Sequence, residues 1–190
     1  LENEVMKDDI FFRSSGGGVT LSGGEVLLQA PFATRFLQRL RRYGVHTAIE
    51  TAGDAPLSRL MPLACQCDEV LFDLKIMDAE QAHSRVAMNL PRVLDNFMQL
   101  VAEGINVIPR VPLIPGYTLN EANMARVLAF LLPSGIRQLH LLPFHQFGEP
   151  KYRLLGQKWD MRQVAPPTEE EVSAIRLMAE REGFQVTIGG

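Results

Sequence analysis

The chain has 190 residues, of which 46% are apolar, 22% charged and 7% aromatic. These proportions are typical of a globular fold, and they exclude a disordered, collagen-like or coiled-coil chain. The net charge of −3 argues against a basic surface for nucleic acid, and no apolar run is long enough to span a membrane. We therefore expect neither nucleic acid nor a membrane as a partner.

The cysteine content and the first residue suggest the setting of the chain. Only two cysteines, Cys65 and Cys67, are present, which is too few for a disulfide framework. We see no signal peptide and expect a cytoplasmic protein with a single domain over residues 1–190. Because residue 1 is leucine rather than methionine, we also expect a piece of a longer protein.

Short β-rich runs alternate with amphipathic helical patterns along the chain. The runs predict strands at 18–22, 47–51, 69–74, 106–111, 138–143 and 184–188. The spacing of apolar side chains predicts helices at 31–43, 57–64, 79–86, 91–103 and 168–182. It also predicts a helix that Thr118 or Asn120 can cap, with Met124, Val127, Leu128 and Leu131 on one face. A capping box at Thr168 and Glu171 opens the last helix, and residues 144–167 before it show no regular pattern. This alternation predicts an α/β fold whose parallel sheet is built from right-handed βαβ units.

Polar residues follow the predicted strands at the points where the strands end. The five sets are Ser22 with Glu25, Glu50 with Thr51, Asp73 with Lys75, Arg110, and His145. Because the carboxyl ends of parallel strands meet at one face, we expect these groups to form a shared ligand site. Carboxylates facing a lysine, an arginine and a histidine suit a zwitterionic small molecule better than a polyphosphate. Some of these residues could instead be helix caps or surface ion pairs.

Five glycines flank the first strand, at 16–18 and 23–24. Glycine permits a close approach of the backbone to a ligand, although residues 16–18 could equally be a flexible turn. The segment GGGVTLSGGE is neither a dinucleotide-binding GxGxxG turn nor a Walker A loop. A nucleotide phosphate site is therefore a poor interpretation of these glycines.

Three segments, GGGVTLSGGE, DLK and LLPFH, occur in this order in the chain. Together they resemble the glycyl radical enzyme activating enzymes, which are radical S-adenosylmethionine (SAM) proteins. The resemblance covers the chain from about Val5 onward. It implies a partial (β/α)6 TIM-like barrel with a mostly parallel sheet, missing its first strand here. It also implies that SAM binds at the carboxyl ends of the strands.

The resemblance assigns cofactor-binding roles residue by residue. Gly23, Gly24 and Glu25 match the element that holds the methionyl amino group of SAM. Glu50 and Thr51 match the pair beside the methionyl carboxylate, with glutamate in place of the more usual aspartate. The remaining matches are Asp73, Leu74 and Lys75 in the DLK segment, His145 near the adenosyl group and, more weakly, Arg110. No catalytic residue and no metal ligand is assigned to this chain.

The chain departs from the family at the iron–sulfur cluster. The family holds a [4Fe-4S] cluster with a CxxxCxxC motif, which this sequence lacks. Cys65 and Cys67 have the wrong spacing and position, and we interpret them as small apolar residues at a helix end. We therefore expect the cluster in an intact parent protein and no radical activity from this chain alone.

For the intact parent, the resemblance implies formation of a 5'-deoxyadenosyl radical that removes a hydrogen atom from a glycine of a partner. The implied partners are a glycyl radical enzyme such as pyruvate formate-lyase and an electron donor such as flavodoxin or ferredoxin. Two alternatives stay open. The chain could be an aldolase-type barrel that uses Lys75 as a Schiff-base amine, although carboxylates beside Lys75 disfavour that role. It could also be a non-catalytic barrel that docks a partner through residues 144–167.

Overall fold

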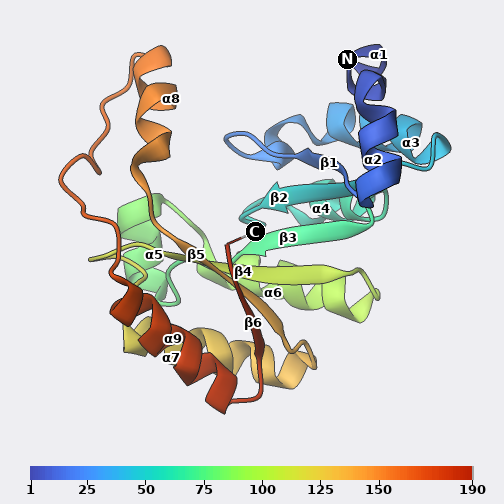
Figure 1. Cartoon of the computed structure of the whole chain (residues 1–190). Helices are drawn as coiled ribbons and strands as arrows, with labels where there is room; N and C mark the ends of the chain where they lie inside the picture. The colour runs from blue at the N-terminus through green and yellow to red at the C-terminus, as the bar shows by residue number, and fades with distance from the viewer. Residues whose placement is uncertain (190) are drawn as a thin grey trace. The chain divides into compact units, whose positions relative to one another are not determined.

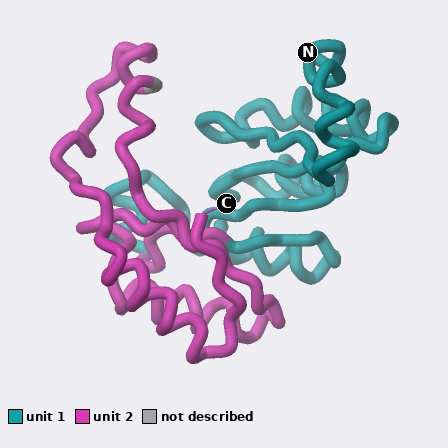
Figure 2. The backbone as a smooth tube through the Cα atoms, viewed as in Figure 1, with its two compact units in different colours: residues 1–73, 79–109 teal, residues 74–78, 110–190 magenta. Residues whose placement is uncertain are grey.

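The computed structural model describes residues 1–189, apart from the side chain of Lys151. The chain separates into two compact units, coloured teal and magenta in Figure 2. Unit 1 comprises Leu1–Asp73 and Ala79–Pro109, and unit 2 comprises Leu74–Asp78 and Arg110–Gly190.

Unit 1 contains three parallel strands and the helices that cover them (Figure 1). Its strands are β1 (Gly18–Leu21), β2 (His46–Thr51) and β3 (Glu69–Asp73), and its helices include α3 (Ala30–Arg42), α4 (Leu57–Ala64), α5 (Ala79–Val86) and α6 (Leu90–Ala102). A 3-10 turn, η2 (Val26–Gln29), precedes α3. Val19 pairs with Thr47 and Ile49 pairs with Val70, which fixes the registers of both ladders. Each helix buries apolar residues against the sheet, Phe36 and Leu40 in α3 among them, but Phe32 and Tyr43 of the predicted α3 stripe are exposed.

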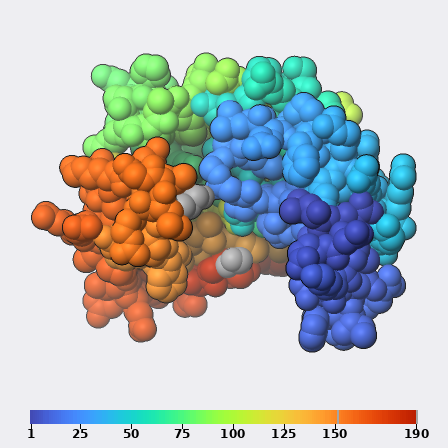
Figure 3. All heavy atoms as spheres, turned by 90° about the horizontal axis from the view of Figure 1, so that it is seen from above, coloured from blue at the N-terminus to red at the C-terminus, as the bar shows by residue number. Residues whose placement is uncertain are grey.

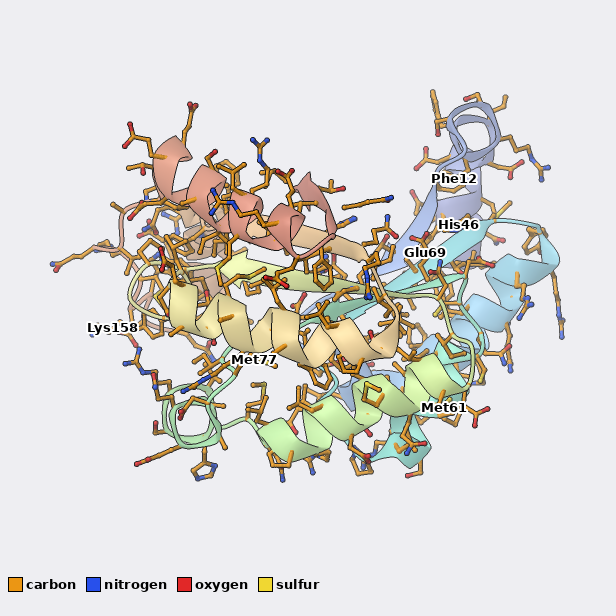
Figure 4. The ribbon with its side chains drawn as sticks, turned by 90° about the horizontal axis from the view of Figure 1, so that it is seen from below. Phe12, His46, Met61, Glu69, Met77 and Lys158 are labelled. Atoms are coloured by element: carbon orange, nitrogen blue, oxygen red, sulfur yellow. The ribbon has the colours of Figure 1, made fainter. Side chains whose placement is uncertain are left out.

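A helical segment precedes β1 that the sequence analysis did not predict. It consists of α1 (Glu2–Val5), η1 (Met6–Asp8) and α2 (Asp9–Ser15), and it appears in dark blue in Figure 3. Val5, Met6 and Phe12 of this segment pack against a cluster formed by Phe36, Leu40 and Val45. Phe12 is labelled in Figure 4, near His46 at the start of β2. This contact stabilises helices too short to be stable alone.

Unit 2 contains the later strands and helices. Its elements are β4 (Val107–Leu113, which begins in unit 1), α7 (Glu121–Leu131), η3 (Leu132–Ser134), β5 (Gln138–Pro143), η4 (Gln146–Gly148), α8 (Glu149–Leu154), α9 (Glu169–Arg181) and β6 (Gln185–Ile188). The predicted capping box of α9 is confirmed, because the Thr168 side chain accepts from the Glu171 N–H and the Glu171 carboxylate accepts from the Thr168 N–H. The segment expected to be irregular contains α8, which lies at the surface in Figure 3.

The strands follow one another in the sheet in chain order, β1 to β6, with β1 and β6 at the two edges. The ladders β1–β2, β2–β3, β4–β5 and β5–β6 are parallel. Backbone bonds from Val70 to Asn106 and from Leu74 to Arg110 advance by equal steps on both strands, which is the parallel arrangement. The predicted α/β fold with an open parallel sheet is therefore confirmed.

Strand β4 runs further than the sequence analysis expected. The prediction ended this strand at residue 111 because Pro109 removes a ladder N–H. The structure continues the strand to Leu113 and includes a second proline, Pro112. Pairing of Leu113 with Pro143 of β5 carries the ladder past both prolines.

Within the residues that the structure describes, none of the helices is both long enough and apolar enough to cross a bilayer.

Candidate functional site

The Glu25 carboxylate joins the loop after β1 to the end of β2 in unit 1. One oxygen, Oε1, accepts hydrogen bonds from Thr51 Oγ1 at 2.7 Å and from the Leu27 N–H at 3.1 Å. The other oxygen, Oε2, accepts from the Ala52 N–H at 3.0 Å. Two residues of the predicted site, Glu25 and Thr51, are therefore in direct contact. Their contact fixes the position of the loop relative to the strand.

A second contact joins the same two strand ends. Ser22 Oγ donates to Glu50 Oε2 at 2.5 Å. Between these two contacts lie Gly23, whose φ of +151° favours glycine, and Gly24. A Cβ on either glycine would meet no atom within 4 Å, so the backbone here has open space beside it. The loop also lines a hollow of about 240 Å³ together with Phe32 and other residues at the start of α3.

The loop after β2 turns sharply at Gly53. Its φ is +68°, and a Cβ at this position would lie 2.1 Å from the Phe72 ring of β3. Only glycine fits both requirements. Beyond it, Asp54 accepts hydrogen bonds from the Arg92 guanidinium at 2.6 and 2.9 Å and from the Asn89 N–H at 3.1 Å. The loop after Thr51 is thus bound to α6 and to the residue that caps it.

In unit 2, the residues after β3 and within β4 lie together. The Leu74 N–H donates to the Arg110 carbonyl at 2.8 Å, which places the DLK segment beside β4. Leu74 is buried and Lys75 is half-buried. Arg110 lies in the middle of β4, not at its end as predicted, and it is buried. The extension of β4 through Pro112 is the reason for this difference.

His145 follows β5 and caps the short turn η4. Its Nδ1 accepts from the Phe147 N–H at 3.2 Å, and its ring lies 4.3 Å from that of Phe147, centroid to centroid. His145 is exposed. With Nδ1 engaged by the backbone, the Nε2 atom is the one that this geometry presents to a ligand.

The predicted site residues are therefore divided between unit 1 and unit 2. Gly23, Gly24, Glu25, Glu50 and Thr51 lie together at the carboxyl ends of β1 and β2, with Asp73 at the end of β3. Leu74, Lys75, Arg110 and His145 belong to unit 2. That all of them share one cleft stays a prediction.

Proteins of known function resemble this chain in sequence along its whole length. The chain is 70% identical over all its residues to the pyruvate formate-lyase 2-activating enzyme of Escherichia coli (strain K12), and it spans 65% of that protein. It is 30% identical to the pyruvate formate-lyase 1-activating enzyme of the same strain, covering 98% of this chain and 77% of that protein. The chain belongs to the radical SAM activating enzymes.

A solved structure agrees with this assignment. A domain of a pyruvate formate-lyase activating enzyme from Bacteroides vulgatus superposes with a TM-score of 0.75 and 27% identity, over 92% of this chain and 99% of that one. No family model matches the chain. The chain spans about two thirds of the length of the first curated relative.

The two cysteines of this family member do not fit an iron–sulfur cluster. A [4Fe-4S] site needs cysteine thiolates, and burial raises the pKa of the Cys67 thiol to about 12, with a further contribution from Asp68. Cys65 is exposed. Among the described residues there is no group of three or more histidine, cysteine or acidic side chains that could hold a metal.

The sequence analysis missed two buried polar residues near the site, Asn96 of α6 and Asn123 of α7. Each lies on the apolar stripe of its helix, next to Phe97 or Met124. An amide at a stripe position is the signal that could have revealed them, because buried polar side chains need hydrogen-bond partners.

Proposed function

We propose that this chain is the SAM-binding part of an activating enzyme that installs a glycyl radical in a partner protein. The observation that carries the proposal is the 70% identity to a pyruvate formate-lyase activating enzyme along the whole chain. The partner would be a glycyl radical enzyme of the pyruvate formate-lyase type. The relatives support this role over an aldolase that uses Lys75 and over a docking barrel without catalysis.

The loop after β1 suits the amino-acid end of SAM. The backbone at Gly23 and Gly24 has open space beside it, and its carbonyl oxygens could accept hydrogen bonds from the ammonium group of the ligand. Glu25 would act through its three protein contacts, which hold this loop against Thr51 and Ala52. Glu50 would lie beside the methionyl carboxylate, while Asp73, Leu74, Lys75, Arg110 and His145 would contact the rest of the ligand.

Bound SAM would supply a 5'-deoxyadenosyl radical, with one electron breaking its C–S bond and methionine leaving, while the protein would position the ligand and exclude side reactions. Reduction needs a [4Fe-4S] cluster and an electron donor such as flavodoxin or ferredoxin. We place the cluster in the remainder of a full-length activating enzyme, because this chain has only two cysteines. We accordingly propose that the chain alone is inactive and that the full-length protein acts in the cytoplasm.

The test compares the full-length protein with this chain alone. Both are reconstituted with iron and sulfide, reduced, and supplied with SAM and a pyruvate formate-lyase-type partner. We expect 5'-deoxyadenosine and a glycyl radical signal by electron paramagnetic resonance only with the full-length protein. If the full-length protein cleaves no SAM, the proposed function is wrong. If this chain alone cleaves SAM, its proposed inactivity is wrong.

A further inference from the structure

Asn123 is a buried residue whose side-chain amide hydrogen-bonds to the backbone of neighbouring loops. It is 7% exposed and lies in the first turn of α7. Its Oδ1 accepts from the Met77 N–H at 2.8 Å, and its Nδ2 donates to the Lys75 carbonyl at 2.9 Å. Figure 4 labels Met77 beside α7. One amide thus binds both ends of the three-residue segment that begins at Lys75.

The same amide also reaches the loop after β4. Nδ2 lies 3.4 Å from the Thr118 carbonyl. The Thr118 hydroxyl accepts from the Ile114 N–H at 2.8 Å and donates to the Pro112 carbonyl. Asn123 therefore connects the DLK segment with the loop that follows β4, entirely within unit 2.

The sequence places Asn123 where it can do this. Asn120 caps α7, and its Oδ1 accepts from the Asn123 N–H at 2.8 Å. This cap fixes the first turn, so the Asn123 side chain leaves the helix in a set direction. An amide matches an N–H and a carbonyl at once, whereas a carboxylate matches only the N–H and a leucine matches neither.

The arrangement occurs a second time, in unit 1. Asn96 of α6 is 2% exposed, and its Nδ2 donates to the carbonyls of Gly53 and Ala55 at 2.7 and 2.8 Å. These carbonyls belong to the loop after Glu50 and Thr51. In both units, a buried asparagine holds a loop that directly follows a predicted cofactor-binding pair.

We infer that Asn123 is a positioning residue that sets the place of Lys75 for SAM binding. This inference rests on the proposed function. Burying an amide is costly unless it is fully hydrogen-bonded, and here every bond goes to loop backbone near the site rather than to the core. Without Asn123, the segment from Lys75 to Met77 loses its hydrogen bonds to α7. The backbone from which the Lys75 side chain extends is then less well fixed.

The test uses the full-length reconstituted protein and four variants. Asn123→Ala removes all three side-chain hydrogen bonds, to Met77, Lys75 and Thr118, and Asn123→Asp keeps only the bond from the Met77 N–H. Leu128→Ala, which removes a buried side chain from the same helix, controls for loss of stability. Asn106→Ala controls for loss of an asparagine-to-backbone bond, since Asn106 donates to the Asp68 carbonyl before β3. The readouts are the SAM dissociation constant by equilibrium dialysis and amide hydrogen exchange over residues 75–77.

We expect both Asn123 variants to weaken SAM binding by about tenfold or more, because a small displacement of a binding group is costly. Exchange at Met77 should rise strongly in Asn123→Ala and less in Asn123→Asp. Leu128→Ala and Asn106→Ala should keep SAM affinity within about twofold of the parent protein, since neither touches the segment. If Asn123→Ala does not fold, the SAM dissociation constant and the amide exchange of Asn123→Asp test the inference.

Two results would overturn the inference. One is unchanged SAM affinity in a folded Asn123 variant whose exchange over residues 75–77 is faster. The other is an equal loss of affinity in Leu128→Ala, which would assign the effect to stability. A parent protein that binds no SAM would instead defeat the proposed function, so the two failures are distinguishable.

Discussion

Gly53 shows how a single residue shapes the loop after β2. Replacing it with alanine puts a Cβ into a left-handed backbone and 2.1 Å from the Phe72 ring. We expect Gly53→Ala to lower the free energy of unfolding by about 3 kcal/mol, from backbone strain and overpacking together. Gly104→Ala is the matched control, because Gly104 has a φ of +71° with nothing within 4 Å of its Cβ. It should cost only about 1 kcal/mol. Equal losses in urea unfolding would contradict the steric argument.

The two cysteines should differ strongly in reactivity. Burial raises the pKa of Cys67 to about 12, whereas Cys65 is exposed. The thiolate is the reactive form, so at pH 8 we expect a maleimide to label Cys65 at least about a hundredfold faster than Cys67. Because the raised pKa keeps Cys67 protonated, its labelling rate should keep rising with pH well above 9. Mass spectrometry of Cys65→Ser and Cys67→Ser measures each rate separately, and similar rates at pH 8 would refute the prediction.

Side-chain identity predicted some site residues better than others. Glu25 and Thr51 could be predicted as neighbours because polar groups at the ends of adjacent parallel strands share one edge. The stripe positions of Asn96 and Asn123 signal burial, but their partners could not be assigned, because these are loop carbonyls and an N–H group that only the folded chain brings near. Arg110 was misplaced relative to the strand end because the sequence does not show that β4 continues through Pro112.

The contact between the loop after β1 and the end of β2 is a feature of elements rather than of one side chain. Glu25→Gln replaces one carboxylate oxygen with an NH₂ group. This group cannot accept a hydrogen bond, so at least one of the three bonds is lost and its donor faces another donor. We expect the free energy of unfolding to fall by about 1–2 kcal/mol and the Ala52 amide to exchange faster. Glu103→Gln, at an exposed position after α6, is the control and should change neither quantity. Unchanged exchange at Ala52 in Glu25→Gln would show that the loop is held by other contacts.

Within the part of the chain that the structure describes, the six strands and the six longer helices were predictable at this scale, because their apolar residues recur at regular spacing. The short helices were not. Segments α1 and α2 depend on packing of Val5, Met6 and Phe12 against Phe36 and Leu40, a contact remote in sequence. The segment 144–167, which contains α8, is held by Gln146 of η4. The Gln146 side chain donates to the carbonyls of Met161 and Val164 and accepts from the Trp159 indole at 2.6 Å. Such tertiary bonds leave no periodic pattern.

For the molecule as a whole, the number of cysteines limits what the chain can assemble alone. We expect anaerobic incubation of this chain with iron and sulfide to give no stable [4Fe-4S] cluster. The chain has two thiols instead of three thiolate ligands, and the raised pKa of Cys67 keeps one of them protonated. Visible absorption and iron analysis measure the result, and Cys65→Ser should give the same result as the unchanged chain. A cluster that survives desalting and disappears in Cys65→Ser would contradict this expectation.

The buried asparagines also set an order of events during synthesis of the chain. Asn96 lies 41 and 43 residues after the carbonyls that it holds, and Asn123 lies 46 and 48 residues after Met77 and Lys75. When the ribosome has made a strand and its loop, the side chain that fixes the loop has not yet been translated. Each loop can therefore gain these hydrogen bonds only after the helix that carries its asparagine has emerged. A nascent chain stalled before α7 would carry Lys75 in a loop without its amide anchor.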